Sequence, residues 1–351
     1  MAAATGQRGC GPSTVGGPTG GGLSAQGGPL RGNTNVTNAI ELHKVVKRYG
    51  DFLAVDQLDL AVQPGQIVGF LGPNGAGKTT TIRMIMSIIY PDSGQISVLG
   101  RPRALEVKDR IGYLPEERGL YRKMTVDATL RYFGRLKGMA RRELDGRIGE
   151  CLEQVGLSQW RHKRVEALSK GMSQKLQFVV TILHQPELVI LDEPFSGLDP
   201  INMEVLKDLV IDLKRRGATV VFSTHQMEQA QRLCDRLVLI NRGRKLIEGT
   251  LEEIRARFSS RQVIIEGEGD FGPLAELEGV IDSEITAGSA RLEIERRLEP
   301  DVLLRRAIEC GRVSRFEVQR LDLHEIFVKL VEQDLAQVGN AIQPATQESL
   351  A

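Results

Sequence analysis

Hydrophobic and polar residues alternate along residues 40–46 and 53–62, which is the pattern of strands with one buried face. Residues 67–71 are instead continuously apolar, as expected for a strand that is buried on both faces. A glycine-rich stretch over 72–80 follows, and the apolar face that begins at Thr81 predicts a helix to about residue 89. The folded part of the chain is therefore predicted to begin with three strands, a loop and a helix.

Helical and strand patterns then alternate as far as residue 240. A charged, helix-like stretch comes first, over about 124–165. The patterns after it predict helices at 170–184, 202–216 and 226–233 and strands at 188–191, 218–222 and 236–240. Strands that alternate with helices predict an α/β fold, in which helices cover a largely parallel sheet.

The composition changes near Arg255, which predicts a second and smaller unit. Alternating segments at 262–266, 291–294 and 315–318 and helix-like pieces at 271–277, 300–310 and 322–334 predict a small α+β domain without a chemical motif. The predicted divisions are a disordered glycine-rich tail over 1–37, a first domain over 38–254, the α+β domain over 255–335 and a polar tail over 336–351.

Charge and composition exclude several classes of protein. The 46 Lys and Arg residues balance 45 Asp and Glu residues, and the net charge of +1 argues against a general nucleic-acid binder. No stretch approaches the ~18 apolar residues that cross a bilayer. The four cysteines and five histidines are dispersed, which argues against a zinc cluster or a disulfide framework.

The glycine-rich stretch carries a phosphate-binding motif. Residues 72–79 read GPNGAGKT, which fits G-x-x-x-x-G-K-[ST] between a predicted strand and a predicted helix. Backbone N–H groups of such a loop surround phosphate oxygens, and the helix adds its positive N-terminal end. Lys78 is expected to reach the β- and γ-phosphates, and the Thr79 hydroxyl to ligate Mg²⁺. The candidate nucleotide-binding residues of the loop are Gly72, Asn74, Gly75, Gly77, Lys78, Thr79 and Thr80.

Two carboxylates follow the apolar strand at 188–191. A buried strand delivers Asp192 to the carboxyl edge of the sheet, where the phosphate-binding loop also lies. Asp192 is expected to hold Mg²⁺, usually through water, and Glu193 to orient or activate the attacking water. The alternative is a pair that only caps the next turn, and the presence of the phosphate-binding loop argues against it.

With these motifs, the sequence resembles the ATP-binding subunits of ABC transporters. Four further segments support the resemblance: 168–172 (LSKGM) against the signature Leu-Ser-Gly-Gly-Gln, 196–199 (SGLD) against the D-loop, 223–225 (STH) against the switch histidine, and Tyr49 against the aromatic residue that stacks on adenine. The resemblance covers about residues 40–245. It implies a P-loop NTPase cassette with a mixed, largely parallel sheet and a helical subdomain over about 105–165.

The resemblance also implies a site shared by two chains. Ser169 and Gly171 would offer a hydroxyl and a backbone N–H to the γ-phosphate held by a second cassette, so that two chains enclose two ATP molecules. Ser169 fits a simple helix N-cap as well. His225 would hydrogen-bond the γ-phosphate, Tyr49 would stack on adenine, and Asp199 would contribute through the D-loop. The alternatives are a structural histidine and a surface aromatic residue.

Three positions depart from the family pattern. Lys170 and Met172 replace the usual Gly and Gln of the signature. Glu116 stands where the family has a Gln that touches Mg²⁺ and faces the membrane partner. A carboxylate also ligates Mg²⁺, so Glu116 is a candidate metal ligand. Alternatively, Glu116 points to solvent, or it pairs with Arg118 or with a basic residue of a partner protein. The string at 111–121 and the added C-terminal domain resemble a subgroup related to sodium-extrusion and drug-resistance exporters.

The implied function is an ATPase that binds ATP and Mg²⁺ and powers a membrane transporter, with export as the favoured direction. Its partners would be integral-membrane permease subunits and a second cassette, without nucleic acid. Through the permease it would lie at the cytoplasmic face of the membrane. The cargo is not predicted.

Two other functions compete with this interpretation. One is a non-transport ABC-type ATPase that acts on a soluble or nucleic-acid partner. Such proteins carry two cassettes or a long inserted coiled coil, whereas this chain has one phosphate-binding loop, with Lys78 and Asp192 only 114 positions apart. The other is a regulatory GTPase, which needs an Asn-Lys-x-Asp motif, and the sequence contains no Asn-Lys pair.

Overall fold

The computed structural model describes residues 37–341 except 118, 259–260, 296 and 321. The predicted glycine-rich tail thus lies outside the described residues up to residue 36, and so do residues 342–351 of the predicted polar tail. No helix in the described part of the chain has both the length and the apolar character needed to span a bilayer.

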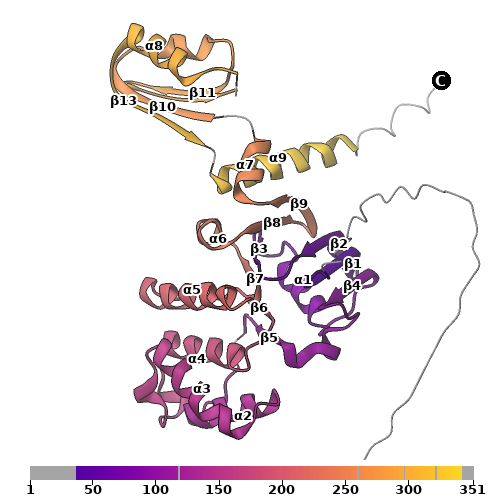
Figure 1. Ribbon diagram of the computed structural model, residues 1–351. Coiled ribbons are helices and arrows are strands. Elements are labelled where there is room, and N and C mark those ends of the chain that lie inside the picture. Colours follow the sequence, from indigo (N-terminus) through magenta and orange to yellow (C-terminus); the bar gives the residue numbers. More distant parts are fainter. Residues whose placement is uncertain (1–36, 118, 259–260, 296, 321, 342–351) are drawn as a thin grey trace, which may run out of the picture. The chain divides into compact units, whose positions relative to one another are not determined.

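A six-stranded sheet with the order β5-β6-β7-β3-β8-β9 is the largest sheet of the described residues (Figure 1). Its strands are β3 (Ile67–Leu71), β5 (Ile111–Leu114), β6 (Leu188–Asp192), β7 (Thr219–Thr224), β8 (Arg236–Asn241) and β9 (Arg244–Gly249). All neighbouring strands are parallel except β9, which is antiparallel to β8. The ends of β3, β6 and β7 therefore meet at one edge, where Leu71 pairs with Thr224 and Asp192 with Ser223.

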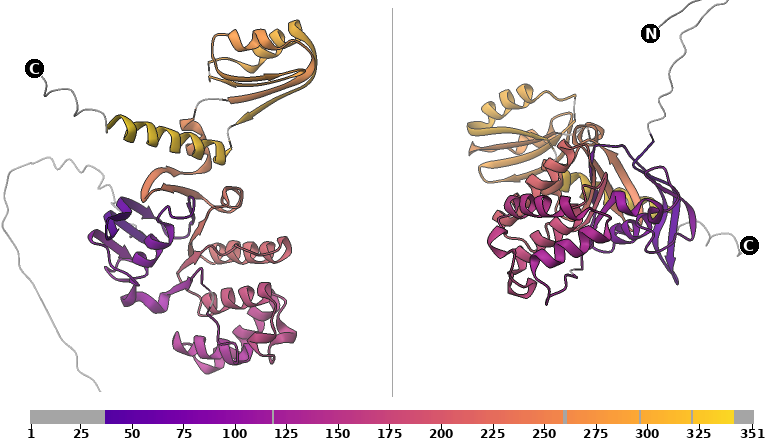
Figure 2. Two further views of the ribbon diagram at one scale, coloured as in Figure 1. Left: turned by 180° about the vertical axis from the view of Figure 1, so that it is seen from behind. Right: turned by 60° about the horizontal axis from the view of Figure 1, so that its bottom comes forward.

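Both faces of this sheet are covered, as Figure 2 also shows. Val189 and Leu191 of β6 belong to a core shared with α4 and α5, whereas Leu188 and Ile190 belong to a core shared with α1. Burial on both faces explains why these strands read as continuous apolar runs. The helices are α1 (Lys78–Ile85), α4 (Lys170–Ile182) and α5 (Pro200–Arg215). The prediction of a largely parallel sheet covered by helices is confirmed.

A three-stranded antiparallel sheet with the order β2-β1-β4 contacts α1. Its strands are β1 (Ile40–Tyr49), β2 (Phe52–Val62) and β4 (Ser93–Val98). Their alternating sequences bury one face, which includes Ile40 and Leu42 of β1 and Leu58 of β2. The hairpin between β1 and β2 pairs Tyr49 with Phe52. The period-two alternation thus predicted β1 and β2 correctly.

Helices α2 (Val126–Leu136) and α3 (Arg141–Gln154) lie in the stretch predicted to be helical, and both contact α4. The side chain of Thr125 caps α2 by accepting a hydrogen bond from the backbone N–H of Ala128 at 3.2 Å. Of the span 105–165 that the resemblance assigns to a helical subdomain, residues 111–114 form β5 of the six-stranded sheet.

Residues 261–320 contain a four-stranded antiparallel sheet with the order β11-β12-β10-β13. Its strands are β10 (Arg261–Gly269), β11 (Val280–Thr286), β12 (Ser289–Ile294) and β13 (Gly311–Arg320). Helix α8 (Pro300–Cys310) packs on this sheet over a core that includes Val263, Leu292 and Leu303. The predicted α+β character agrees with this arrangement. The piece expected at 271–277 is a short 3₁₀ helix, Gly272–Glu276.

The last helix, α9 (Leu323–Ala341), contacts α6 (Met227–Leu233), α7 (Leu251–Arg257) and β9. Leu323 and Ile326 are fully buried in the core that also contains residues of α4 and α5. The helix predicted at 322–334 is therefore longer than expected, and it packs on α6, α7 and β9. Residues 336–341, which belong to the predicted polar tail, are helical. The division near residue 255 stays a prediction.

Candidate active site

The phosphate-binding loop leaves the end of β3 and enters α1, which is the context that the motif requires. Gly77 precedes α1 with a φ of 102°, and a Cβ at this position would lie 2.5 Å from the carbonyl oxygen of Ala54. Only glycine fits such a position. The loop lines a pocket of about 330 Å³ with Asn74, Gly75, Gly77, Lys78, Thr79 and Thr80, and Phe52, Glu116 and Glu193 lie in the same lining.

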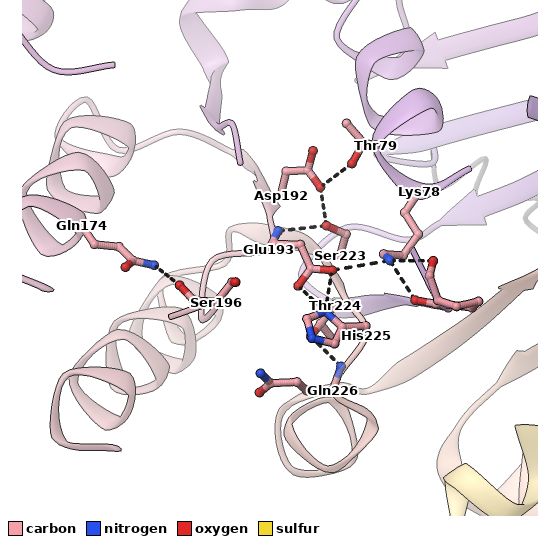
Figure 3. Close-up of polar contacts among 12 residues, drawn as sticks. Lys78, Thr79, Gln174, Asp192, Glu193, Ser196, Ser223, Thr224, His225 and Gln226 are labelled. Atoms are coloured by element: carbon pink, nitrogen blue, oxygen red, sulfur yellow. Dashed lines mark hydrogen bonds and ion pairs between the residues drawn. The ribbon is translucent and has the colours of Figure 1, made fainter. Parts of the chain in front are cut away.

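Lys78 is buried beneath this loop (Figure 3). Its Nζ donates hydrogen bonds to the carbonyl oxygens of Gly72 at 2.8 Å and Pro73 at 3.2 Å, and it lies 3.5 Å from Oε1 of Glu193. An ammonium group has three protons, and these partners account for all three. Binding of a phosphate oxygen therefore requires Lys78 to exchange at least one of these contacts.

Asp192 ends β6 beside the loop. Its Oδ1 accepts hydrogen bonds from the hydroxyls of Thr79 at 3.2 Å and Ser223 at 2.5 Å. Its Oδ2 is buried without a hydrogen-bond partner among the described residues. A buried carboxylate oxygen without a partner is costly, and a hard divalent cation or a water bound to it would satisfy this oxygen. Thr79 and Asp192 therefore fit a Mg²⁺ ion.

Protein side chains do not form a closed metal site here. No group of three His, Cys, Asp or Glu residues in the described part of the chain could hold a metal ion by itself. Mg²⁺ typically combines one or two protein ligands with waters and the phosphates of a nucleotide. The site around Asp192 fits this pattern, because the protein would supply only part of the ligands.

Glu193 follows β6 with a φ of 48°, in the left-handed region that non-glycine residues rarely adopt. Its carboxylate lies between Lys78 and His225, whose Nδ1 is 3.1 Å from Oε2 of Glu193. When the carboxylate is ionised, this contact requires the proton on Nδ1 of His225. His225 then donates to a phosphate only if the ring is doubly protonated or if it releases Glu193.

Glu116 comes two residues after the end of β5 and lines the same pocket. Burial raises the pKa of the nearby Tyr113 to about 12, and the negative charge of the Asp192 carboxylate is the second cause of this increase. Glu116 acts on the Tyr113 pKa in the same direction. The structure thus brings Glu116 to the site of Asp192 and Glu193, whereas Arg118, its alternative partner, lies outside the described residues.

The signature and the D-loop begin two helices that contact each other, α4 and α5. Ser169 caps α4 by accepting from the backbone N–H of Met172 at 3.2 Å, so the N-cap prediction is confirmed. Asp199 caps α5 in the same way, with the N–H of Asn202 at 2.9 Å. A Cβ on Gly171 would lie 2.8 Å from Nδ2 of Asn202, so the two helix starts are closely packed. Ser169, Gly171 and Asp199 are not among the described residues that line the loop pocket.

The aromatic residue in the pocket lining is Phe52. Tyr49 stands opposite it across the β1–β2 turn and is half exposed, outside the lining of the pocket. Gln174 and Ser223 had no predicted role from the sequence. The buried Nε2 of Gln174 donates to the carbonyl oxygen of Pro194 at 2.6 Å, and Ser223 contacts both carboxylate residues. The sequence signal that could have identified Phe52 as a pocket residue is its position three residues after Tyr49, across a tight turn.

Comparisons with known proteins agree with this geometry. The profile of the ABC transporter family matches residues 55–196, and the profile described as "ATP-binding protein DrrA1-3-like, C-terminal domain" matches 249–331. An uncharacterized ABC transporter ATP-binding protein, YhaQ of Bacillus subtilis (strain 168), is 43% identical over 292 residues, which cover 83% of this chain and 98% of that protein.

Two further proteins that are similar to this chain are also ATP-binding proteins of transport systems. The Nod factor export ATP-binding protein I of Cupriavidus metallidurans is 35% identical over 86% of this chain and 99% of its own length. A solved structure of the ATP-binding subunit of an ABC transporter superposes with a TM-score of 0.59 and 32% identity, over 63% of this chain and 93% of that one. This chain therefore belongs to the ABC transporter family, as an ATP-binding subunit whose ATP hydrolysis powers transport.

Proposed function

We propose that this chain binds Mg·ATP in the loop pocket and hydrolyses it with Glu193 as the residue that activates water. The observation that supports this most is the convergence of Lys78, Thr79, Asp192, Glu193 and His225 at the edge where β3, β6 and β7 end. Lys78 would bind the β- and γ-phosphates after it exchanges its contact with Glu193. The freed Glu193 carboxylate would then orient and deprotonate the attacking water.

The metal in this proposal is Mg²⁺, which supplies charge stabilisation to the phosphates when it is bound. Thr79 and Asp192 would hold it, and Glu116, two residues after β5, would add a third oxygen. His225 would donate to the γ-phosphate and keep its orientation through Glu193. Phe52 or Tyr49, on either side of the hairpin turn, would offer an aromatic face to the adenine.

The site would be completed by a second cassette, identical or different. Ser169 and Gly171 lie at the N-terminal end of α4 and outside the loop pocket, so within one chain the signature and the pocket are separate. The positive end of a helix is suited to an anion, and a γ-phosphate held by a second chain would provide that anion.

ATP-dependent dimerisation tests this proposal. The Glu193→Gln protein is expected to shift from monomer to dimer with Mg·ATP and to remain a monomer with Mg·ADP, because only ATP offers the γ-phosphate to Ser169. Size-exclusion chromatography with light scattering measures the shift. Adding Ser169→Ala should weaken the dimer by about tenfold, on the scale of a lost charge-assisted hydrogen bond.

Thr125→Ala is the matched control, because Thr125 caps α2 with the same hydrogen bond to a backbone N–H as Ser169 makes at α4. Both changes remove one N-cap, at a cost of about 1 kcal/mol in stability. Equal dimer affinities for the Ser169→Ala and Thr125→Ala proteins would contradict a role of Ser169 at the interface.

We further propose that the partner in the membrane is a permease that docks on the helical part of the cassette. Tyr121, Tyr132 and Phe133 form an aromatic cluster with ring centroids 5.2–6.2 Å apart. Tyr121, Tyr132 and the neighbouring Leu136 are exposed. An exposed apolar patch of this kind marks an interaction site.

Bound to such a permease, the chain would lie at the cytoplasmic face of the membrane. The relative named for Nod factor export supports export as the direction of transport.

Glu116 gives a test of the metal site. If it adds an oxygen to Mg²⁺, Glu116→Ala should raise the Mg²⁺ concentration for half-maximal ATPase activity several-fold, on the scale of one lost carboxylate ligand. Glu116→Gln should fall between alanine and wild type, because its carbonyl oxygen still ligates but is neutral. The measurement is a Mg²⁺ titration at saturating ATP. The adjacent exposed Glu117→Ala is the control, and superimposable curves for all four proteins would exclude a metal role for Glu116.

A further inference from the structure

Ser223 lies one residue before the end of β7, and its side chain is fully buried. In the parallel register of β6 and β7 it is the neighbour of Asp192. Its hydroxyl therefore sits at the edge of the sheet where the two carboxylate residues leave β6. The role proposed so far for the segment 223–225 belongs to His225 alone.

The Ser223 hydroxyl joins the two carboxylate residues, as Figure 3 shows. It donates a hydrogen bond to Oδ1 of Asp192 at 2.5 Å and accepts one from the backbone N–H of Glu193 at 3.0 Å. A hydroxyl has one proton and two lone pairs, so one oxygen atom performs both functions. Alanine at this buried position would remove both contacts at once.

The first contact decides which oxygen of Asp192 remains available. Oδ1 already accepts from Thr79 and Ser223, whereas Oδ2 is buried without a partner among the described residues. The Ser223 hydroxyl thus turns the carboxylate so that Oδ2 is the oxygen left for a cation or its water. Thr79 donates to the same oxygen, but its contact of 3.2 Å is longer than the 2.5 Å contact of Ser223.

The second contact holds the backbone that presents Glu193. A φ of 48° is unfavourable for a residue with a Cβ, and it persists only where the surroundings fix it. The Ser223 oxygen accepts the N–H of that strained residue. With the backbone held in this way, the Glu193 carboxylate lies between Lys78 and His225.

We propose that Ser223 is a positioning residue of the hydrolytic site, whose single hydroxyl sets both the metal-facing oxygen of Asp192 and the backbone of Glu193. The inference rests on the proposed function, since it assumes that Asp192 faces Mg²⁺ and Glu193 faces the water. It assigns to Ser223 no direct contact with ATP. Loss of the hydroxyl should therefore disturb metal binding and turnover, and it should leave the affinity for the nucleotide without metal nearly unchanged.

The test compares Ser223→Ala and Ser223→Thr with Thr219→Val in the full chain. Thr219 is the matched control, because it starts the same strand, is equally buried and accepts a backbone N–H from Gly65 at 3.0 Å, at the opposite end of β7. Mn²⁺ affinity is measured by electron paramagnetic resonance with a non-hydrolysable ATP analogue. Turnover, analogue affinity without metal and thermal stability are measured in parallel.

Ser223→Ala is expected to weaken Mn²⁺ binding and to lower kcat by about tenfold or more each, the scale for residues that orient metal ligands. Affinity for the metal-free analogue should stay within about twofold, since Ser223 is buried and is not among the described residues that line the loop pocket. Ser223→Thr should recover most of the Mn²⁺ affinity, because it keeps the hydroxyl. Thr219→Val should lower thermal stability and leave Mn²⁺ affinity unchanged.

Two outcomes separate this inference from the proposed function. If the wild-type chain bound no Mn²⁺ together with the analogue, the proposed metal site itself would be wrong. If the wild-type chain bound Mn²⁺ and the Ser223→Ala protein bound it equally well, the positioning role of Ser223 would be overturned and the proposed site would stand.

Discussion

Replacing Glu193 with glutamine is expected to lower ATP turnover by about 10²-fold or more while ATP binding is retained, the scale for loss of a general base. Glutamine has the size of glutamate, but its amide does not accept a proton from water at neutral pH. The Glu193 carboxylate lies 3.5 Å from Lys78 and 3.1 Å from His225, so it is held in the lining of the loop pocket. The measurement is steady-state phosphate release together with ATP affinity.

Glu204→Gln is the matched control for this change. Glu204 also pairs with a buried lysine, Lys207, at 2.7 Å, but the pair lies within α5 and outside the loop pocket. It should leave turnover close to wild type. Near-wild-type turnover in the Glu193→Gln protein would show that another group activates the water.

Replacing Lys78 with alanine is expected to weaken ATP binding by about 10- to 10²-fold, because charge-assisted hydrogen bonds contribute about 1.5–3 kcal/mol. The substitution also leaves the carbonyl oxygens of Gly72 and Pro73 without their donor and the buried Glu193 carboxylate without its cation. Two effects are therefore superimposed, one on ATP binding and one on the stability of the loop. Nucleotide affinity is measured by fluorescence of an ATP derivative, and stability by thermal unfolding.

Lys207→Ala separates these two effects. Lys207 is as buried as Lys78 and carries one ion pair, so its loss should lower the thermal stability without changing ATP affinity. An ATP affinity of the Lys78→Ala protein equal to that of the Lys207→Ala protein would place the phosphates elsewhere than the loop pocket.

Much of the fold was predictable from the sequence because buried and exposed positions in the structure follow the apolar and polar positions in the sequence. The runs at β3 and β6 are apolar throughout because helices cover both faces of the sheet. Strands β4, β5, β9 and β11 were not predicted from the sequence. Each is short or carries polar residues on an open edge, so local pattern gives little signal and pairing with a neighbour creates the strand.

Helix α9 shows a second limit of local patterns. Its apolar spacing predicted a helix, but the spacing does not say which surface the apolar side chains meet. The structure places Leu323 and Ile326 in the core that contains residues of α4 and α5, and α9 contacts α6 and α7, although the helix follows the C-terminal sheet in the chain. Which distant elements a helix packs against depends on the complementary shape of their surfaces. The periodicity of apolar residues within the helix does not contain this information.

The sequence by itself determined the chemistry of this protein, because the loop at 72–79 and the carboxylates at 192–193 are defined by residue type and spacing, and parallel strands must deliver both to one edge. Only the tertiary structure decided how the groups are paired. In the folded chain Phe52 lines the pocket, and Ser223 forms hydrogen bonds with Asp192 and Glu193. One oxygen of Asp192 has no hydrogen-bond partner among the described residues. Such contacts depend on the register and twist of neighbouring strands, which are properties of the folded sheet.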